Sequence, residues 1–181
     1  MKNAILLLLF IMASTAFAQQ EEKIDLPIDP ETKHIKFQEV VHEQGSKQKL
    51  FNRCVYWLYK YYKDPDRVLS IRDPHTGKIA GQHRFRVYYW DKDSIRHIGG
   101  TIDYTFTIEF KDGRYRYTIN KLLLKTASKF PVENWLDKNS PDYDPRWDSY
   151  LKQISEFINK WIDTLKENMK PEEPKKTDDD W

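Results

Sequence analysis

Arginine and aromatic residues alternate along two stretches of the chain that favour β-strands. The candidate site residues are Arg84, Arg86, Tyr88 and Trp90 on the first stretch and Arg114 and Arg116 on the second. Guanidinium groups bind carboxylates, phosphates and sulfates, while aromatic rings offer flat surfaces to sugars and peptides. If the two faces coincide, they predict a binding surface for a small anionic, glycan or peptide ligand. The plainer alternative is a solvated sheet face that Glu109 and Asp103 partly neutralise.

Residues that could bind a metal are present, but their spacing matches no metal site. His83 and His97 lie in expected strands and lack a ligand spacing. Five side chains have the composition of a calcium loop: Asp137, Asn139, Asp142, Asp144 and Asp148. Pro141, however, stands at a ligand position of that loop, and no glycine forms the turn. We expect no metal and no cofactor.

Motifs for nucleophilic hydrolysis are missing from the sequence. No G-x-S-x-G occurs, and no Cys–His signature surrounds Cys54, the single cysteine. Cys54 falls on the apolar face of an expected helix, which predicts a small buried side chain. Paired carboxylates need only proximity in space, so a glycoside hydrolase stays an alternative. The favoured expectation is a protein without catalytic residues that is not an enzyme.

Two amphipathic helices are predicted to hold these strands in place. Residues 47–63 carry apolar side chains at helical spacing, with Ser46 as a suitable N-cap and Pro65 just beyond the end. A second helix begins where Asp144 is the cap and Pro145 takes the first helical position. Its apolar residues again recur on one face, so both helices need an apolar surface to cover.

Five strands are predicted, and the clearest lies at residues 98–110. The strands span residues 34–42, 67–72, 79–90, 98–110 and 114–123. Ile98, Ile102 and every second residue to Phe110 form one apolar face, as a half-buried strand requires. Asp112-Gly113 predicts a two-residue hairpin turn.

The hairpin turn predicts a register in which the numbers of paired residues add up to 225. Phe110 then lies opposite Tyr115, and Ile102 lies opposite Leu123. The same register pairs Glu109 with Arg116, so one face is apolar and the other carries an ion pair.

The expected fold is a two-layer α+β domain with element order β-α-β-β-β-β-α. A five-stranded antiparallel sheet with one apolar face is satisfied by packing both helices on that face, which leaves the other face open to water. We expect a single domain over residues 34–169. A flexible lead-in at 19–33 precedes it, and a disordered charged tail at 170–181 follows it.

Residues 1–18 have the three parts of a secretory signal peptide. Lys2 is followed by an apolar stretch too short to span a bilayer, and Ala16-Phe17-Ala18 offers the small residues that signal peptidase requires. We expect cleavage after Ala18 and a soluble protein in the periplasm or outside the cell, with no transmembrane segment.

The charge of the expected mature chain limits its partners. Removal of residues 1–18 takes away one basic residue and leaves 29 basic against 28 acidic side chains. This balance argues against nucleic-acid binding, which rests on a surplus of basic groups. The leading hypothesis is an exported, non-enzymatic binding module for a small ligand, glycan or envelope protein. The alternative is an accessory subunit of an envelope complex that docks through Trp90, Trp135 or Trp181.

Two short motifs resemble a known bacterial family. The run SKQKLF at residues 46–51, followed by Trp57, and the run DPHTGKIAG at residues 73–81 are similar to an exported, Bacteroides-type domain family of unknown function. The resemblance covers roughly residues 35–125 and implies a TATA-binding-protein-like fold, in which helices cover a curved sheet. It implies no activity, because fold alone does not determine function. The fold's namesake binds DNA on the open sheet face, but export and near-neutral charge argue against that role here.

Overall fold

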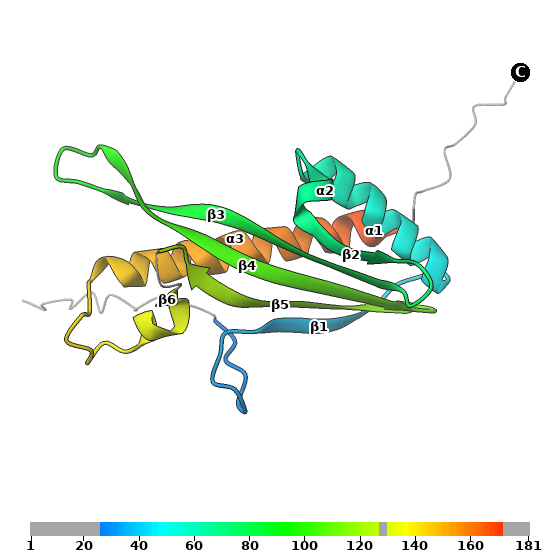
Figure 1. The fold of residues 1–181 in the computed structure, drawn as a ribbon, viewed down its shortest axis with the longest axis horizontal. Helices are drawn as coiled ribbons and strands as arrows, with labels where there is room; N and C mark the ends of the chain where they lie inside the picture. Colours follow the sequence, from blue (N-terminus) through cyan, green and yellow to red (C-terminus); the bar gives the residue numbers. More distant parts are fainter. Residues whose placement is uncertain (1–25, 127–129, 172–181) are drawn as a thin grey trace, which may run out of the picture.

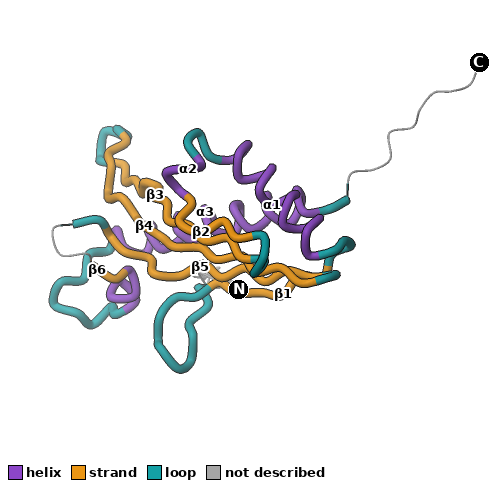
Figure 2. Tube along the Cα trace, turned by 45° about the vertical axis from the view of Figure 1, so that its right-hand side comes forward, coloured by secondary structure: helices purple, strands orange, loops and turns teal. Residues whose placement is uncertain are grey.

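The computed structural model describes residues 26–126 and 130–171. Its elements are β1 (Phe37–His42), α1 (Lys47–Tyr61), α2 (Pro65–Val68), β2 (Leu69–Asp73), β3 (Lys78–Trp90), β4 (Arg96–Lys111), β5 (Arg114–Leu124), β6 (Phe130–Pro131), the 3-10 helix η1 (Val132–Leu136) and α3 (Arg146–Met169). The sheet is antiparallel with strand order β1-β5-β4-β3-β2, and β6 pairs with β5. Helices α1 and α3 lie behind one face of this twisted sheet (Figures 1 and 2). The predicted two-layer α+β architecture is confirmed.

Both long helices begin with the caps that the sequence predicts. The Ser46 side chain accepts a hydrogen bond from the Lys49 N–H at 3.4 Å. Asp144 accepts one from the Arg146 N–H at 2.9 Å, and Pro145 already has helical backbone angles. Cys54 is fully buried in α1, as predicted, and burial raises the pKa of its thiol.

The core lies between the two helices and the inner face of β3, β4 and β5. Trp57 of α1 and Trp161 of α3 meet edge to face with ring centroids 5.0 Å apart. The Tyr62 hydroxyl accepts a hydrogen bond from the Trp161 indole at 2.9 Å and lies 3.0 Å from the Tyr104 hydroxyl. This buried network joins α1, α3 and β4, because each polar group finds its partner on another element.

Two stretches differ from their predicted secondary structure. Arg67 lies in the one-turn helix α2 rather than in a strand, because Pro65 restarts a helix just after α1 has ended. The strand that follows, β2, begins at Leu69. The connection before α3 contains β6 and η1, which the sequence pattern does not reveal, and η1 buries Trp135 in the core.

A β-bulge near Gly99 changes which face Ile98 occupies. Val87 of β3 pairs with Gly100, but the next residue, Tyr88, pairs with Ile98, so Gly99 is an extra residue. Ile98 is therefore on the open face and 56% exposed, whereas the period-two pattern places it with Ile102 on the apolar face. That prediction for Ile98 was wrong because it assumes an uninterrupted strand.

A second irregularity at Lys121 shifts the far end of the hairpin. The predicted register holds from Lys111 opposite Arg114 to Thr105 opposite Asn120, after which Ile102 lies opposite Leu124 instead of Leu123. Lys121 has a positive φ of 53°, the conformation of an inserted bulge residue. The insertion buries Leu122 completely, and the predicted pairing of Ile102 with Leu123 was wrong.

Part of the expected lead-in has a definite conformation. Within residues 26–33, the Asp29 carboxylate accepts hydrogen bonds from the N–H groups of Glu31 and Thr32 and contacts Lys36 at 2.9 Å. These interactions hold the pKa of Asp29 below its usual range. The expected signal peptide, residues 1–18, and residues 172–181 of the expected charged tail lie outside the described residues.

Candidate functional site

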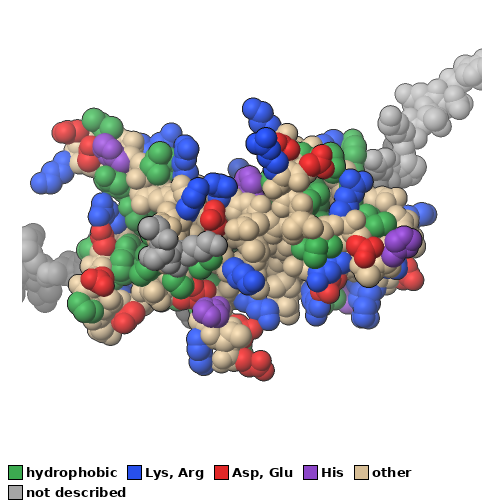
Figure 3. Space-filling view, in the orientation of Figure 1, with side chains coloured by type: hydrophobic (Ala, Val, Ile, Leu, Met, Phe, Trp, Pro, Cys, Tyr) green, Lys and Arg blue, Asp and Glu red, His purple; other side chains and the backbone are tan. Residues whose placement is uncertain are grey.

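The candidate arginines occupy the open face of the sheet, as the sequence predicts. Cross-strand rows on this face run from β3 across β4 to β5. The central rows carry no charge: Ala80, Thr107 and Thr118 form one, and Gln82, Thr105 and Asn120 form the next. Figure 3 shows uncharged atoms over the middle of this face, with Lys and Arg side chains around them.

The arginines of β3 and β5 share a face but do not form one patch. Arg84 lies in the row of Asp103, whereas Arg116 lies in the row of Glu109, six residues further along β4. At roughly 3.3 Å per residue, this separates the two rows by about 20 Å. A single ligand of small size cannot contact both groups, so the surface divides into two ends.

Each end contains one paired and one unpaired arginine. Arg84 lies 3.9 Å from Asp103, and Arg116 forms an ion pair with Glu109. The guanidinium groups of Arg86 and Arg114 have neither a hydrogen bond nor an ion pair to any residue that the structure describes. Asp103 and Glu109 therefore neutralise only two of these four arginines, whereas the interpretation as a plain solvated sheet face relies on these two acids to offset the charge.

Tyr88 and Trp90 lie on an arm, the part of the β3–β4 hairpin that projects beyond the sheet at the left of Figure 1. Trp90 is 58% exposed, and Ile95 and Ile98 are similarly exposed. Arg96 lies over the Tyr88 ring at 4.6 Å from its centroid. The arm thus has an apolar surface of its own, away from Arg114 and Arg116.

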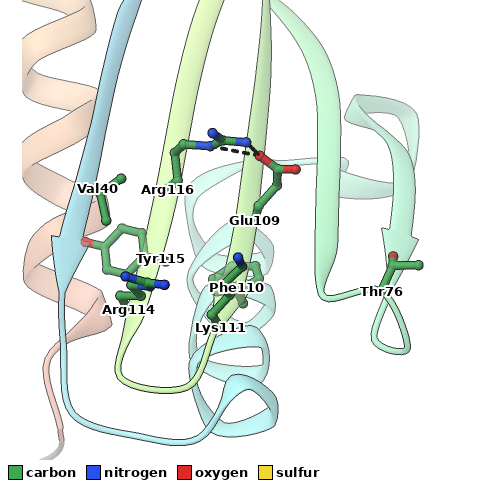
Figure 4. A pocket seen from close by; sticks show the side chains of 8 residues that line it. All are labelled: Val40, Thr76, Glu109, Phe110, Lys111, Arg114, Tyr115 and Arg116. Atoms are coloured by element: carbon green, nitrogen blue, oxygen red, sulfur yellow. Dashed lines mark hydrogen bonds and ion pairs between the residues drawn. The ribbon is translucent and has the colours of Figure 1, made fainter.

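The other end of the open face contains a pocket of about 440 Å³, the hairpin-end pocket. Its lining comprises Val40, Thr76, Glu109, Phe110, Lys111, Arg114, Tyr115 and Arg116 (Figure 4). Lys111 lies directly opposite Arg114 across the hairpin. The carboxylate of Asp112, in the turn between them, accepts a hydrogen bond from the Lys47 N–H at the start of α1. Lys111 and Arg114 are therefore two like charges that face each other across the hairpin, and such a pair destabilises the pairing of two strands.

A second pocket, of about 450 Å³, lies at the edge of β3 and is called the β3-edge pocket. It is lined by Tyr62, Lys63, Asp64, Arg67, Val68, Gln82, His83, Arg84 and Asp103. Of these, the sequence predicts a site role for Arg84 alone. The residues after α1 were missed because a Pro65 turn brings them to β3, although the basic residues Lys63 and Arg67 beside that turn were a usable signal.

His83 lies in the wall of the β3-edge pocket. Its ring packs against Tyr62 with centroids 4.8 Å apart, and its Nδ1 atom is buried without a hydrogen-bond partner among the described residues. Burial, with a smaller contribution from Arg84, lowers the pKa of His83. The imidazole is therefore neutral at pH 7.

The structure forms a metal site neither from His83 and His97 nor from the acidic loop at residues 137–148. His83 pairs with Tyr104 and His97 pairs with Tyr89, so the two histidines lie in different rows. Across residues 26–126 and 130–171, no group of three His, Cys, Asp or Glu side chains is arranged to hold a metal ion. Asp64 and Asp103 share the β3-edge pocket, and each faces an arginine, Arg67 or Arg84.

No helix among the described residues has the length and apolar character needed to cross a bilayer.

Comparison with known proteins relates this architecture to one family. The model of a domain of unknown function with TBP-like fold, DUF4468, matches residues 37–124. A TBP-like protein from Parabacteroides distasonis superimposes with a TM-score of 0.62 and 14% identity over 80% of this chain and 96% of that one. A DUF4468 family protein from Bacteroides ovatus gives 0.64 and 13% over 82% and 94%. No curated protein matches. From the family match and the shared fold, residues 37–124 of this chain form a domain of the DUF4468 family with TBP-like fold.

Proposed function

We propose that the chain is an exported, non-enzymatic binding module whose hairpin-end pocket holds a ligand bearing carboxylate or sulfate groups. The observation that carries this proposal is the pair of like charges, Lys111 opposite Arg114, in the lining of the pocket. An anionic ligand supplies the missing negative charge. The forked guanidinium of Arg114 suits a planar carboxylate or a sulfate, because it offers several donors at once.

The charges around the pocket support an anion over a neutral sugar. Its lining contains three basic side chains and one acid, Glu109, which already pairs with Arg116. Arg114 is exposed and has no partner among the described residues, so its donors are available. Thr76 adds a hydroxyl to the lining. The uncharged rows beyond the pocket can extend the contact to a chain of sugar rings.

A calorimetric titration tests this binding. The probes are a sulfated disaccharide, an oligogalacturonate and, as a neutral comparison, cellohexaose. We expect the two anionic probes to bind with an affinity that falls as salt increases, because the contact is electrostatic. Arg114→Glu should weaken binding by at least about tenfold, since it reverses the unpaired charge.

Arg86→Glu is the matched control, because Arg86 is also an unpaired arginine on the open face but lies at the other end. It should change the affinity by less than about twofold. Equal losses in the two variants, or no binding of either anionic probe, would contradict the proposal.

Stability gives an independent prediction about the same pair. Lys111→Glu turns a repulsive cross-strand pair into an attractive one, so the free protein should gain about 0.2–1 kcal/mol of unfolding free energy while its binding of the anionic probes is lost. Urea denaturation measures the first effect and calorimetry the second. Lys111→Gln should give a smaller gain. A loss of stability in Lys111→Glu would show that the pair is not under electrostatic strain.

Export is part of the proposal and rests on the sequence of residues 1–18. The full chain expressed in a bacterium with a periplasm should be cleaved after Ala18, so that intact-mass measurement finds a protein beginning at Gln19. Replacing Ala18 by Glu should block cleavage, because signal peptidase requires a small residue there. An uncleaved wild-type chain retained in the cytoplasm refutes export.

The exposed arm favours a second function, that of an accessory subunit in an envelope complex. Trp90, Ile95 and Ile98 are large apolar side chains that are each more than half exposed on the arm, and exposed apolar clusters mark protein contacts. Trp135 cannot contribute, because it is buried against Tyr150, and Trp181 lies outside the described residues. A photo-crosslinking amino acid at position 90 should capture a protein in cells. Recovery of monomer alone contradicts this role.

A further inference from the structure

The outer edge of β3 is only partly covered by β2. The β2 pairing ends at Gly81, beyond which the chain turns away into α2. β3 continues for nine more residues to Trp90, paired with β4 on its other side. An unpaired edge offers a row of backbone donors and acceptors to an incoming strand.

The direction of the backbone groups along this edge follows from two contacts. The Ala80 carbonyl accepts a hydrogen bond from the Ser70 hydroxyl on β2, so the backbone N–H and C=O groups of residue 80 point away from β4. The Tyr88 N–H and carbonyl both bond to the Gln153 side chain of α3, so residue 88 also faces away. Because backbone groups alternate along an antiparallel strand, those of Gln82, Arg84 and Arg86 point to the same edge. They have no hydrogen-bond partner in the part of the chain that the structure describes.

The free edge has two defined ends. The Val68 carbonyl approaches Gly81 so closely that a Cβ added there would lie 2.6 Å away, which closes one end. The Gln153 amide closes the other end by pairing with Tyr88 as a strand would. Between them lie six residues, 82–87, or about 20 Å at roughly 3.3 Å per residue. That length accommodates about six residues of an extended peptide.

The charges beside the edge select the kind of peptide. The β3-edge pocket beside it is lined by the basic residues Lys63, Arg67 and Arg84 and by two acids, Asp64 and Asp103, which already face Arg67 and Arg84. Arg86 lies further along β3. Lys63 and Arg86 have no ion-pair partner among the described residues. The β3-edge pocket opens beside Gln82 and Arg84, so a side chain of an added strand can enter it. A carboxylate there meets Lys63 and Arg67.

We infer that the β3 edge binds an extended acidic segment of a partner protein by strand addition, with an acidic side chain in the β3-edge pocket. The backbone groups of Gln82, Arg84 and Arg86 supply the affinity, and the basic residues supply the preference for acid, as in other strand-addition complexes. This inference is independent of the hairpin-end pocket, because the two sites share no lining residue.

The test uses the mature full-length protein and a synthetic peptide, acetyl-Thr-Val-Asp-Val-Glu-Val-Thr-amide, in NMR and fluorescence titrations. We expect saturable binding, with the amide protons of Gln82, Arg84 and Arg86 shifted and slowed in exchange. Lys63→Glu combined with Arg67→Glu should weaken binding at least about tenfold, whereas Lys49→Glu combined with Lys160→Glu, at two exposed lysines that line neither pocket, should change it less than about twofold. A peptide with Lys in place of Asp and Glu should bind more weakly than the acidic peptide.

Peptide N-methylation separates strand addition from simple charge attraction. In two peptide series, methyl groups on alternate amides leave the charges unchanged, and one series should lose binding because its edge-facing donors are blocked. Equal binding of both series, or shifts at Arg114 instead of at Gln82, Arg84 and Arg86, overturns the inference. Tighter binding of a peptide with the sequence of residues 172–181 overturns the choice of a partner protein, because the chain's own tail is then the occupant.

Discussion

At the scale of single residues, His83 shows how a sequence feature with no assigned role becomes informative in the fold. Alternation along the strand puts it on the inner face with Phe85 and Val87, and the structure agrees. Its burial depends on Tyr62, which comes from the end of α1, so sequence alone does not reveal it. The unpaired Nδ1 atom is a polar group that water would otherwise satisfy.

The lowered pKa of His83 predicts a dependence of stability on pH. The unfolded chain protonates this imidazole near pH 6.5, whereas the folded chain does so only at a lower pH. Its contribution is therefore fully present above about pH 6.5 and is lost as the pH falls through the folded-state pKa. His83→Phe should reduce the difference in unfolding free energy between pH 8 and pH 5, as measured by urea denaturation. An unchanged difference would place the acid sensitivity in another group.

At the scale of elements, period-two patterning predicts the strands and their inner faces but not the two interruptions. Phe106, Ile108 and Phe110 are buried where alternation places them, and the Asp112-Gly113 turn correctly sets the first seven pairs of the hairpin. A bulge inverts the pattern beyond it, so Ile98 and Leu123 are misassigned. The Gly99-Gly100 pair was an available signal for the first bulge, since glycine within a strand often marks one. The run of leucines after Lys121 fits either face, so it gives no sign of the second bulge.

Gly99 allows the bulge to pack against α3. A Cβ at this position would lie 2.4 Å from the Tyr150 ring, so Gly99→Ala should cost about 1–3 kcal/mol of stability through overpacking. The same substitution in a Tyr150→Ala background should cost much less, because the obstructing ring is gone. A double-mutant cycle by urea denaturation measures the coupling. Additive losses would show that the close approach is not what requires glycine.

At the scale of the whole molecule, the open face, the β3 edge and the arm are uncovered surfaces of the sheet. The sequence predicts that the six candidate residues lie on the open face, because alternation assigns them to the side opposite the core. The sequence does not predict their division into two ends, because the offset between Arg84 and Arg116 depends on both the β3–β4 register and the β4–β5 register. The β3-edge pocket needs Lys63, Arg67 and Arg84 from three separate segments, which only the folded chain brings together.

The arm has a practical consequence for the study of this protein. Its turn, Asp91–Ile95, is held by its own hydrogen bonds, in which the Asp91 carboxylate accepts from the N–H groups of Asp93 and Ile95. Lys92 and Asp93 are exposed and outside the core. A short Gly-Ser sequence carrying a fluorescent label, inserted between them, interrupts these local hydrogen bonds but no core contact, so it should shift the melting temperature by no more than about 2 °C. Such a label reports from beside Trp90 while both pockets stay intact, so contacts of the arm can be followed separately from ligand binding.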